Sequence, residues 1–306
     1  MYDVVALGEL LIDFVETGEH VFKANPGGAV CNVLAQLQKL GNRTAYIGKV
    51  GNDSFGRYLE DTLKELDIDT CCLRKDDKIP TTLAFVHKKE DGDRDFSFYR
   101  NPGADIMLNE EEIDYSLIEN TRIFHFGSLS LTDEPCRSAT IKALEFARAH
   151  NKLISYDPNL RKPLWPSLEE AKKWIAFGMN YADILKISDD EICWFTGKED
   201  YDEALASLKK DYPNLEYIFL TLGKDGSRCI HKDEDVSVKG KTVVSIDNTG
   251  AGDSFCGAML HCLLHDDFRK SMKEKLDFAN SAAAIVTTKT GALKEMADLN
   301  EIGMIE

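Results

Sequence analysis

The sequence has no surplus of basic residues. Its 306 residues include 37 lysines and arginines against 53 aspartates and glutamates, which gives a formal net charge of −16. Proteins that bind nucleic acids or anionic membranes concentrate positive charge, so this composition speaks against both kinds of partner. A small anionic substrate stays compatible with it, because a local pocket can reverse the overall sign.

The sequence also lacks paired cysteine motifs and an export signal. None of its eight cysteines forms a C-x-x-C pair, and their spacing matches no zinc site. The stretch MYDVVALGELLIDFV carries acidic residues instead of a basic segment, and no later run is apolar enough to span a membrane. We therefore expect reduced, buried thiols, no membrane segment and a cytoplasmic location.

Proline-rich linkers, low-complexity tracts and internal repeats are absent as well. Instead, short apolar runs alternate with amphipathic segments of helical period, which is typical of a parallel sheet covered on both faces. We expect residues 1–306 to form a single α/β domain with a mostly parallel central sheet and helices on both faces. The runs that predict strands cover 3–8, 44–51, 122–129, 153–157, 183–188 and 217–223.

Two segments interrupt this alternation. Residues 10–28 and 81–100 show the period-two pattern of antiparallel hairpins. A hairpin inserted into an α/β domain has to cover another part of the protein. We expect these two segments to form a small β-sheet lid over the ends of the central strands.

The stretch IDNTGAGDSF places three small residues where a helix is predicted to begin, between the β-like run TVVSI and the helical pattern SFCGAMLHCLL. The first amides of a helix have no partner within it, so Gly250, Ala251 and Gly252 can cradle a phosphate. Asp253 beside them suits a general base that takes a proton from an alcohol. The alternative is a simple turn in which Asp253 caps the helix.

Two widely separated motifs resemble a known family. Asp247, Thr249 and the run 250–253, followed by Gly257 and Ala258, resemble the carboxy-terminal signature of the ribokinase-like (PfkB) sugar kinases. NPGGAVCNVLAQLQKLG and GKVGNDSFG resemble the amino-terminal signature, and FSFYRNPGAD and SYDPNLR are most similar to fructokinases. A Walker A sequence and a protein-kinase glycine loop are absent. Departures from common family residues occur at Val30, Leu34, Ser188 and Asn248.

The resemblance implies an ATP-dependent kinase that converts D-fructose to fructose 6-phosphate at the primary hydroxyl, with Mg²⁺ bridging the phosphates. Asp253 becomes the base, and Gly250, Ala251 and Gly252 become the anion hole for the transferred phosphoryl group. Kinases for 2-keto-3-deoxygluconate, ribose or a nucleoside are alternatives within the family, and a non-catalytic sugar- or nucleotide-binding protein is an alternative outside it. A Rossmann oxidoreductase is not indicated, because GELLID lacks the G-x-G-x-x-G fingerprint. The exposed face of the lid favours a homodimer.

The residues expected at the sugar come from five places: after the first strand, at the start of the first helix, within the strand 44–51, along the second hairpin and at the end of a central strand. Charged side chains inside apolar runs, such as Asp13 and Lys49, need partners, and sugar hydroxyls would supply them. Phe96, Phe98 and Arg100 alternate along the chain and so share one strand face. Each of these residues also has a structural explanation that involves no sugar: an exposed position in a hairpin, a strand edge, the core of a lid or a simple turn. The expected sugar-binding set is Asp13, Gly27, Gly28, Asn32, Lys49, Phe96, Phe98, Arg100, Asn159 and Arg161.

Further residues resemble the family's nucleotide and cation sites. Glu191 corresponds to a glutamate that organises Mg²⁺ through water, and Asp247, Thr249 and Gly291 are expected to hold a monovalent cation such as K⁺. Helix capping, an ordinary turn and close helix packing are the structural alternatives for the nucleotide residues. The expected ATP-binding set is Lys186, Ser188, Glu191, Thr221, Gly223, Gly226, Asn280 and Ala283.

Overall fold

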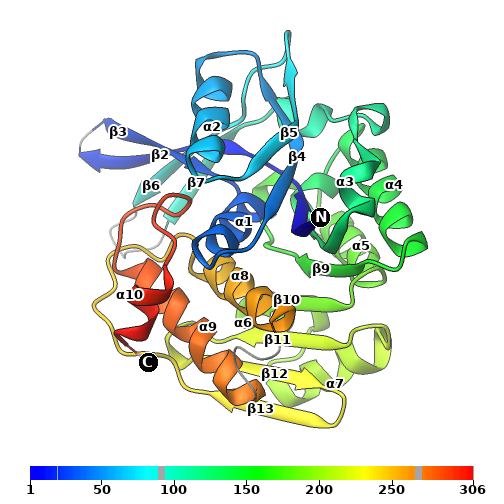
Figure 1. Ribbon diagram of the computed structural model, residues 1–306, viewed down its shortest axis with the longest axis vertical. Coiled ribbons are helices and arrows are strands. Elements are labelled where there is room, and N and C mark those ends of the chain that lie inside the picture. Colours follow the sequence, from blue (N-terminus) through cyan, green and yellow to red (C-terminus); the bar gives the residue numbers. More distant parts are fainter. Residues whose placement is uncertain (19, 89–93, 266–270, 306) are drawn as a thin grey trace.

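A computed structural model of the protein describes residues 1–18, 20–88, 94–265 and 271–305 (Figure 1). The side chains of residues 87, 88 and 94–96 lie outside this description. A large sheet crosses the molecule, and a smaller separate sheet lies beside one end of its strands. This arrangement confirms the predicted α/β architecture.

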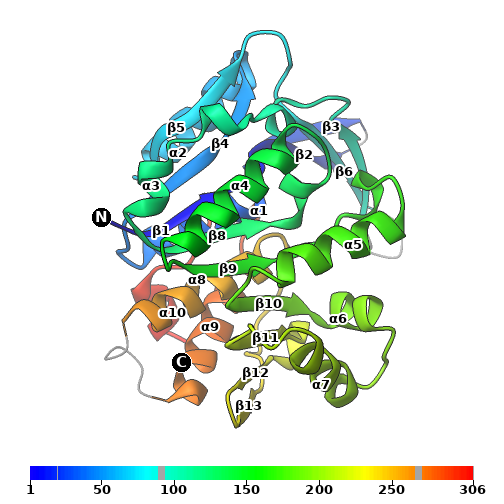
Figure 2. The same cartoon turned by 90° about the vertical axis from the view of Figure 1, so that its right-hand side faces the viewer.

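The large sheet has nine strands within the described ranges, in the order β13-β12-β11-β10-β9-β8-β1-β4-β5 (Figure 2). All neighbours from β11 to β5 pair in parallel, whereas β12 and β13 are antiparallel. The strands are β1 (Tyr2–Leu7), β4 (Thr44–Gly51), β5 (Asp69–Asp76), β8 (Thr121–Gly127), β9 (Leu153–Asp157), β10 (Ile184–Ser188), β11 (Tyr217–Thr221), β12 (Ser227–His231) and β13 (Glu234–Val238).

Helices cover both faces of this sheet because alternate side chains of its strands are apolar in both directions. Val4 and Ala6 of β1 enter one core, while Val5 and Leu7 enter the other. The first core is closed by α1 (Ala29–Lys39), α2 (Ser54–Glu65), α8 (Ala251–Leu264), α9 (Met272–Thr287) and α10 (Leu299–Gly303). The second is closed by α3 (Tyr115–Glu119), α4 (Cys136–Ala149), α5 (Leu168–Met179), α6 (Asp189–Thr196) and α7 (Tyr201–Asp211). Every described helix is too short or too polar to cross a lipid bilayer.

The small sheet has the strand order β3-β2-β6-β7. Each predicted hairpin is antiparallel, and the parallel pairing of β2 with β6 joins the two. Only residues 8–10 separate β1 from β2, so the small sheet begins directly at the carboxyl edge of the large one. Its strands are β2 (Leu11–Gly18), β3 (Val21–Gly27), β6 (Leu83–Lys88) and β7 (Arg94–Tyr99).

Helices α1 and α8 pack directly against each other. A Cβ at Gly257 would collide with the Gln36 side chain and the Val33 carbonyl, so glycine permits the close approach. Gln36 is fully buried and joins three groups: its Oε1 accepts from Ser254 Oγ at 2.7 Å and from the Ala297 amide at 3.2 Å, and its Nε2 donates to the Ala297 carbonyl at 2.8 Å. The amino ends of both helices consequently lie near one another.

The segment before α8 differs from the sequence prediction. The run TVVSI, which has β-strand character, forms neither strand nor helix in the structure. The Ile246 amide donates to the Thr287 carbonyl at the end of α9 (2.7 Å), and Ile246 is 64% exposed. The end of this segment therefore bonds to a helix terminus instead of a neighbouring strand.

Replacing Gln36 with leucine is expected to lower the free energy of unfolding by about 2–4 kcal/mol, because it leaves buried partner groups on Ser254 and Ala297 without hydrogen bonds. Urea unfolding measures this loss. Gln38→Leu is the matched control on the same helix, since Gln38 bonds to the Asp67 carbonyl at the surface. A loss below about 1 kcal/mol at Gln36, or equal losses at both positions, would contradict the role of Gln36 in joining the helices.

Candidate active site

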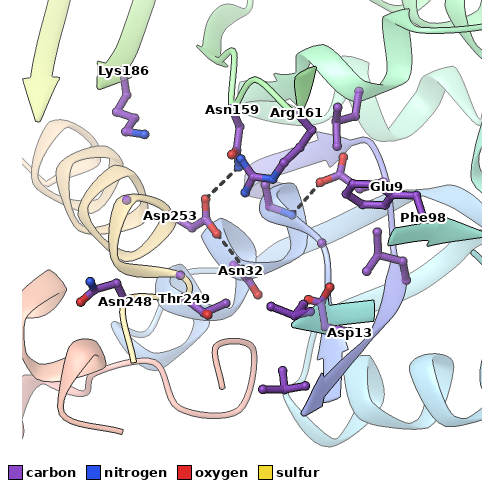
Figure 3. A pocket seen from close by; sticks show the side chains of 18 residues that line it. Glu9, Asp13, Asn32, Phe98, Asn159, Arg161, Lys186, Asn248, Thr249 and Asp253 are labelled. Carbon is purple, nitrogen blue, oxygen red and sulfur yellow. Dashed lines mark hydrogen bonds between the residues drawn. The ribbon is translucent and has the colours of Figure 1, made fainter. Parts of the chain in front are cut away.

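A cavity of about 470 Å³, here called the main cavity, lies between the carboxyl edge of the large sheet, the small sheet and the first turns of α1 and α8 (Figure 3). Parallel strands collect ligand-binding residues at this edge. The main cavity is lined by Glu9, Leu11, Asp13, Val15, Gly28, Ala29, Asn32, Val86, Phe98, Leu129, Asn159, Arg161, Lys186, Asn248, Thr249, Gly250, Gly252 and Asp253.

Asp253 stands in the first turn of α8 and projects into the main cavity (Figure 3). Its two carboxylate oxygens accept hydrogen bonds from Asn32 Nδ2 at 2.8 Å and from Asn159 Nδ2 at 3.4 Å. Burial raises the pKa of Asp253, although the Asn32 bond and the charge of Lys186 act in the opposite direction. A buried, oriented carboxyl group with a raised pKa is suited to accept a proton.

Gly250 precedes α8 with a left-handed φ of 79°, and a Cβ there would collide with Ala292. Its N-cap position therefore carries no side chain that could close over the first helical amides. The next residues, Ala251 and Gly252, begin the helix beside Asp253. The structure thus brings the predicted base and the predicted anion hole to the same helix end, where the helix dipole is positive.

The start of α1 forms the opposite wall. Gly28 has φ 135°, and a Cβ there would collide with the Glu9 carbonyl. Glu9, 4% exposed, accepts from the Ala29 amide through Oε1 at 2.7 Å and so caps α1 from the end of β1. Glu9 Oε2 and Asn32 Oδ1 have no hydrogen-bond partner in the described part of the chain. Both residues line the main cavity, so two buried acceptor oxygens lie at its wall.

One face of the small sheet closes the main cavity. Asp13 and Val15 of β2, Val86 of β6 and Phe98 of β7 all line it. Gly27 in β3 does not line it, but a Cβ there would collide with the Asp13 carboxylate, so glycine lets that side chain reach its position. The Phe96 backbone pairs with Val86, whereas its side chain lies outside the described side chains.

A second cavity, of about 240 Å³, lies on the other side of the first turn of α8. It contains seven of the eight predicted ATP-binding residues; Glu191 does not line it. Lys186 and Gly252 line both cavities, so the two spaces meet there. The nucleotide cavity, as we call it below, is lined by Lys186, Ser188, Asp189, Thr221, Gly223, Gly226, Ala251, Gly252, Phe255, Asn280 and Ala283.

Glu191 holds local structure instead. Its Oε1 accepts from the Leu160 amide at 2.7 Å, and its Oε2 accepts from the amide and the hydroxyl of Ser188, both at 3.0 Å, in a reciprocal cap of α6. Burial opposes ionisation, but the charge of Lys186 and these donors hold the pKa of Glu191 below its ordinary value. Among the described residues, no group of three or more His, Cys, Asp or Glu side chains is arranged to hold a metal ion.

Two predicted sugar ligands lie elsewhere. Lys49 Nζ lies 2.8 Å from Glu112 Oε1 and 3.4 Å from Asp76 Oδ2, outside the main cavity. Arg100 lies one residue past β7 and turns inward, where Asp105 Oδ2 accepts from its Nε at 2.8 Å. The remaining guanidinium nitrogens donate to Thr132 Oγ1 and the Leu129 carbonyl, both at 2.9 Å. Ion pairing within the protein accounts for both buried cations.

The three residues expected at a monovalent cation do come together. Asp247, 7% exposed, accepts from the Thr249 amide at 2.9 Å and from Thr249 Oγ1 at 2.6 Å through Oδ1. Its Oδ2 accepts from the Gly291 amide at 3.2 Å. These contacts hold the loop that leads into α8 against the segment that follows α9.

Comparison with known proteins decides the family. Residues 1–298 match the family described as pfkB family carbohydrate kinase. The chain belongs to this family. The match extends over both signatures, so the cradle before α8 and the glycine pair before α1 are parts of one family pattern.

Relatives within the pfkB family include fructokinases. The chain is 44% identical over 301 residues to the probable fructokinase-2 of Arabidopsis thaliana, an alignment that covers 95% of this chain and 91% of the relative. Its fold superposes with a TM-score of 0.90 on a fructokinase with bound ATP from Xylella fastidiosa, at 27% identity with 100% of this chain and 98% of that one covered. A double mutant of fructokinase from Vibrio cholerae O395, with fructose, ADP and potassium ion bound, also gives 0.90, at 30% identity with 99% and 98% covered.

One buried acid at the site was missed by the sequence prediction. Glu9 lines the main cavity and stands at the carboxyl end of an apolar run, which is the signal that singled out Asp13. Applied evenly to ALGELLI, the same signal would have found it. Asp157, which ends the predicted strand 153–157, lies at the end of β9, 3.1 Å from the Lys186 ammonium.

Glu9→Gln is expected to change the pH dependence of stability. Burial raises the pKa of Glu9 from 4.5 to about 7, so the folded state loses stability relative to the unfolded state as the pH rises from 4.5 through 7. The wild type should lose about 2 kcal/mol between pH 5 and pH 8 that the variant keeps. Urea unfolding at both values measures this, with Glu110→Gln at the surface as the control. Parallel pH profiles for wild type and Glu9→Gln would contradict it.

Proposed function

We propose that this pfkB-family protein is an ATP-dependent fructokinase that transfers the terminal phosphoryl group of ATP to the primary hydroxyl of D-fructose. The observation that carries the proposal is the position of Asp253. Its carboxylate projects into the main cavity from the same helix turn whose residues Ala251 and Gly252 line the nucleotide cavity. An alcohol in one cavity and a terminal phosphate in the other would meet at this turn.

The chemistry of the main cavity favours a neutral sugar with several hydroxyl groups. Asp13, Asn32 and Asn159 line it, and Glu9 Oε2 and Asn32 Oδ1 are buried acceptors without a described partner. Hydroxyl groups can donate to each of these oxygens. Phe98 and Val86 supply apolar surface for the carbon skeleton. The fructokinases among the relatives make D-fructose the first substrate to test.

In the proposed reaction, Asp253 removes the proton of the sugar hydroxyl while the hydroxyl oxygen forms a bond to phosphorus. The bond between phosphorus and the leaving oxygen of ADP breaks, and the first-turn amides at 250–252 stabilise the charge on the transferred group. Asn32 and Asn159 hold the carboxylate in place through their amide hydrogen bonds. Asp13, Gly27, Gly28 and Arg161 complete the proposed sugar site.

The nucleotide cavity is the proposed ATP site, with adenine near Asn280 and Ala283 and the phosphates toward Gly252. Both Glu191 oxygens already accept hydrogen bonds, so it fits Mg²⁺ only through water. Bound Mg²⁺ would neutralise charge on the phosphates. Asp247, Thr249 and Gly291, which the structure brings together, are the residues that would hold K⁺. Chelation of Mg²⁺ should abolish turnover, and K⁺ should support a higher turnover rate than Na⁺. Equal rates with and without Mg²⁺ would contradict the magnesium assignment, and equal rates in K⁺ and Na⁺ would contradict the potassium assignment.

The small sheet, residues 10–28 and 81–100, is the proposed lid of a single domain spanning 1–306. Closed over bound sugar, it would exclude water and limit hydrolysis of ATP.

The eight free cysteines, most of them buried, are consistent with a reducing cytoplasmic location. To test this, the protein is unfolded without a reducing agent and treated with a thiol reagent, and all eight cysteines should react.

The face of the small sheet turned away from the main cavity carries a group of aromatic rings in contact. Phe85 contacts Phe14, Phe22 and Tyr99 with ring centroids 4.9, 5.4 and 5.3 Å apart. Phe55 of α2 packs on Phe14 from one side, while 67% of Tyr99 is exposed. An aromatic surface of this kind favours association, and we propose that two copies pair through it.

Tyr99→Ser is expected to weaken self-association at least about tenfold, because aromatic residues carry much of the binding energy at interfaces. Sedimentation equilibrium measures it. Leu299→Ser is the control, since Leu299 is exposed (45%) on α10, away from this face. A monomeric wild type, or equal weakening in both variants, would contradict pairing through the small sheet.

ADP release against a panel of sugars tests the proposed function. Fructose should give the highest kcat/KM among fructose, ribose, 2-keto-3-deoxygluconate, adenosine and fructose 1-phosphate. Turnover of another member with none on fructose would reassign the substrate, and binding without any turnover would identify a non-catalytic protein.

Asp253→Asn should keep fructose binding and lower kcat by about 10²–10⁴-fold, because the amide cannot accept the proton. Single-turnover assays and fructose titration calorimetry separate the two effects. Near-normal turnover in the variant would refute the role of Asp253.

A further inference from the structure

Lys186 lies in the middle of the site, although its strand is apolar. It is 6% exposed in β10, between the buried residues Leu185 and Ile187. Its ammonium nitrogen lies 3.1 Å from Asp157 Oδ2 on the neighbouring strand β9. A buried ammonium group is costly unless it is paired, so its retention here calls for a specific reason.

The ammonium group points at the first turn of α8 (Figure 3). A Cβ built on Gly252 would lie 3.0 Å from Lys186 Nζ, which leaves no room for a larger residue without movement of the lysine. Lys186 and Gly252 are the residues common to the linings of the main cavity and the nucleotide cavity. The positive charge therefore lies where the two cavities adjoin.

The surrounding charges keep this lysine ionised. Burial alone would lower the pKa of Lys186, but the carboxylates of Asp157, Glu191 and Asp253 raise it above its ordinary value. Glu191 is engaged with backbone amides and Asp253 with Asn32, whereas Asp157 makes the direct ion pair. Asp157 Oδ1 also accepts a hydrogen bond from the backbone amide of Asn159 at 3.1 Å, which fixes the carboxylate at the end of β9.

We propose that Lys186 contacts the phosphoryl group during transfer and that Asp157 is a positioning residue that holds the ammonium at the junction of the two cavities. The proposal rests on the proposed kinase function and refines the general assignment of Lys186 to nucleotide binding. As the sugar oxygen bonds to phosphorus, the bond to ADP breaks and the hydroxyl proton moves to Asp253. Lys186 transfers no proton in this step and balances charge on the phosphoryl oxygens.

Binding measurements distinguish this role from a structural one. A lysine on the transferred group contacts the third phosphate, which ADP lacks. Lys186→Met should therefore weaken binding of the non-hydrolysable analogue AMP-PNP at least about tenfold, while ADP and fructose bind within about threefold of the wild type. It should also lower kcat on fructose by about 10²–10³-fold.

Lys49→Met is the matched control. Lys49 is equally buried (6% exposed) and ion-paired in a strand of the same sheet, but it lines neither cavity. It should retain the wild-type ratio of AMP-PNP affinity to ADP affinity, whatever it loses in melting temperature. Lys186→Arg keeps the charge and should recover part of the AMP-PNP affinity if the methionine variant folds poorly.

Asp157→Asn tests the positioning role. It leaves Lys186 in place but removes its ion pair, so the ratio of AMP-PNP to ADP affinity and kcat should both fall, each by less than in Lys186→Met, with the fructose KM unchanged. An unchanged ratio in Lys186→Met and Lys186→Arg overturns the contact, and an unchanged ratio in Asp157→Asn overturns the positioning.

The outcome is separable from that of the proposed function. If the wild type phosphorylates fructose but the ratio of AMP-PNP affinity to ADP affinity is unchanged in the Lys186 variants, the role of Lys186 is wrong and the kinase function is supported. If no sugar is phosphorylated but this ratio falls in the Lys186 variants, the kinase function is wrong and the contact of Lys186 with phosphate is supported.

Discussion

The contact between α1 and α8 is the constraint on which the site depends. Gly257 lets the helices approach, Gln36 ties them to the segment before α10, and the amino ends of both helices then face one cavity. The bond from Asn32 to Asp253 forms across this contact. Two helix ends therefore border a single space. The end of α8 has no side-chain cap and supplies positive potential there, which is what a reaction that develops negative charge on a phosphoryl group requires.

The large sheet adds the second part of the arrangement. Because β9 and β10 are parallel neighbours, Asp157 and Lys186 lie side by side at the carboxyl edge, and the Lys186 ammonium reaches the first turn of α8. The main cavity is lined by residues of strands, helices and the loops that follow the strands, and the small sheet contributes one wall through Asp13, Val86 and Phe98.

The sequence predicted the parts of this site that depend on local pattern. Gly250 and Asp253 stand in one short motif. The alternation of apolar runs with amphipathic helical segments along the chain predicts the layered sheet directly. Lys49 and Arg100 show where this reasoning stops: a buried cation in an apolar run indicates a partner but not whether that partner is a ligand or Glu112 or Asp105. The partners lie on other elements, and their distances depend on packing that no local pattern encodes.

The site joins groups that lie far apart in the chain: 221 residues separate Asn32 from Asp253. On a translating ribosome, α1 emerges long before α8 has been made, and the polar groups of Asn32 and Gln36 must stay in water until then. An interrupted chain therefore lacks the proposed base and the proposed anion hole, and it leaves the α8-facing side of α1 uncovered for chaperones and proteases. Only a chain synthesised through α8 has the parts to consume ATP, which makes completion of synthesis itself the first control on activity.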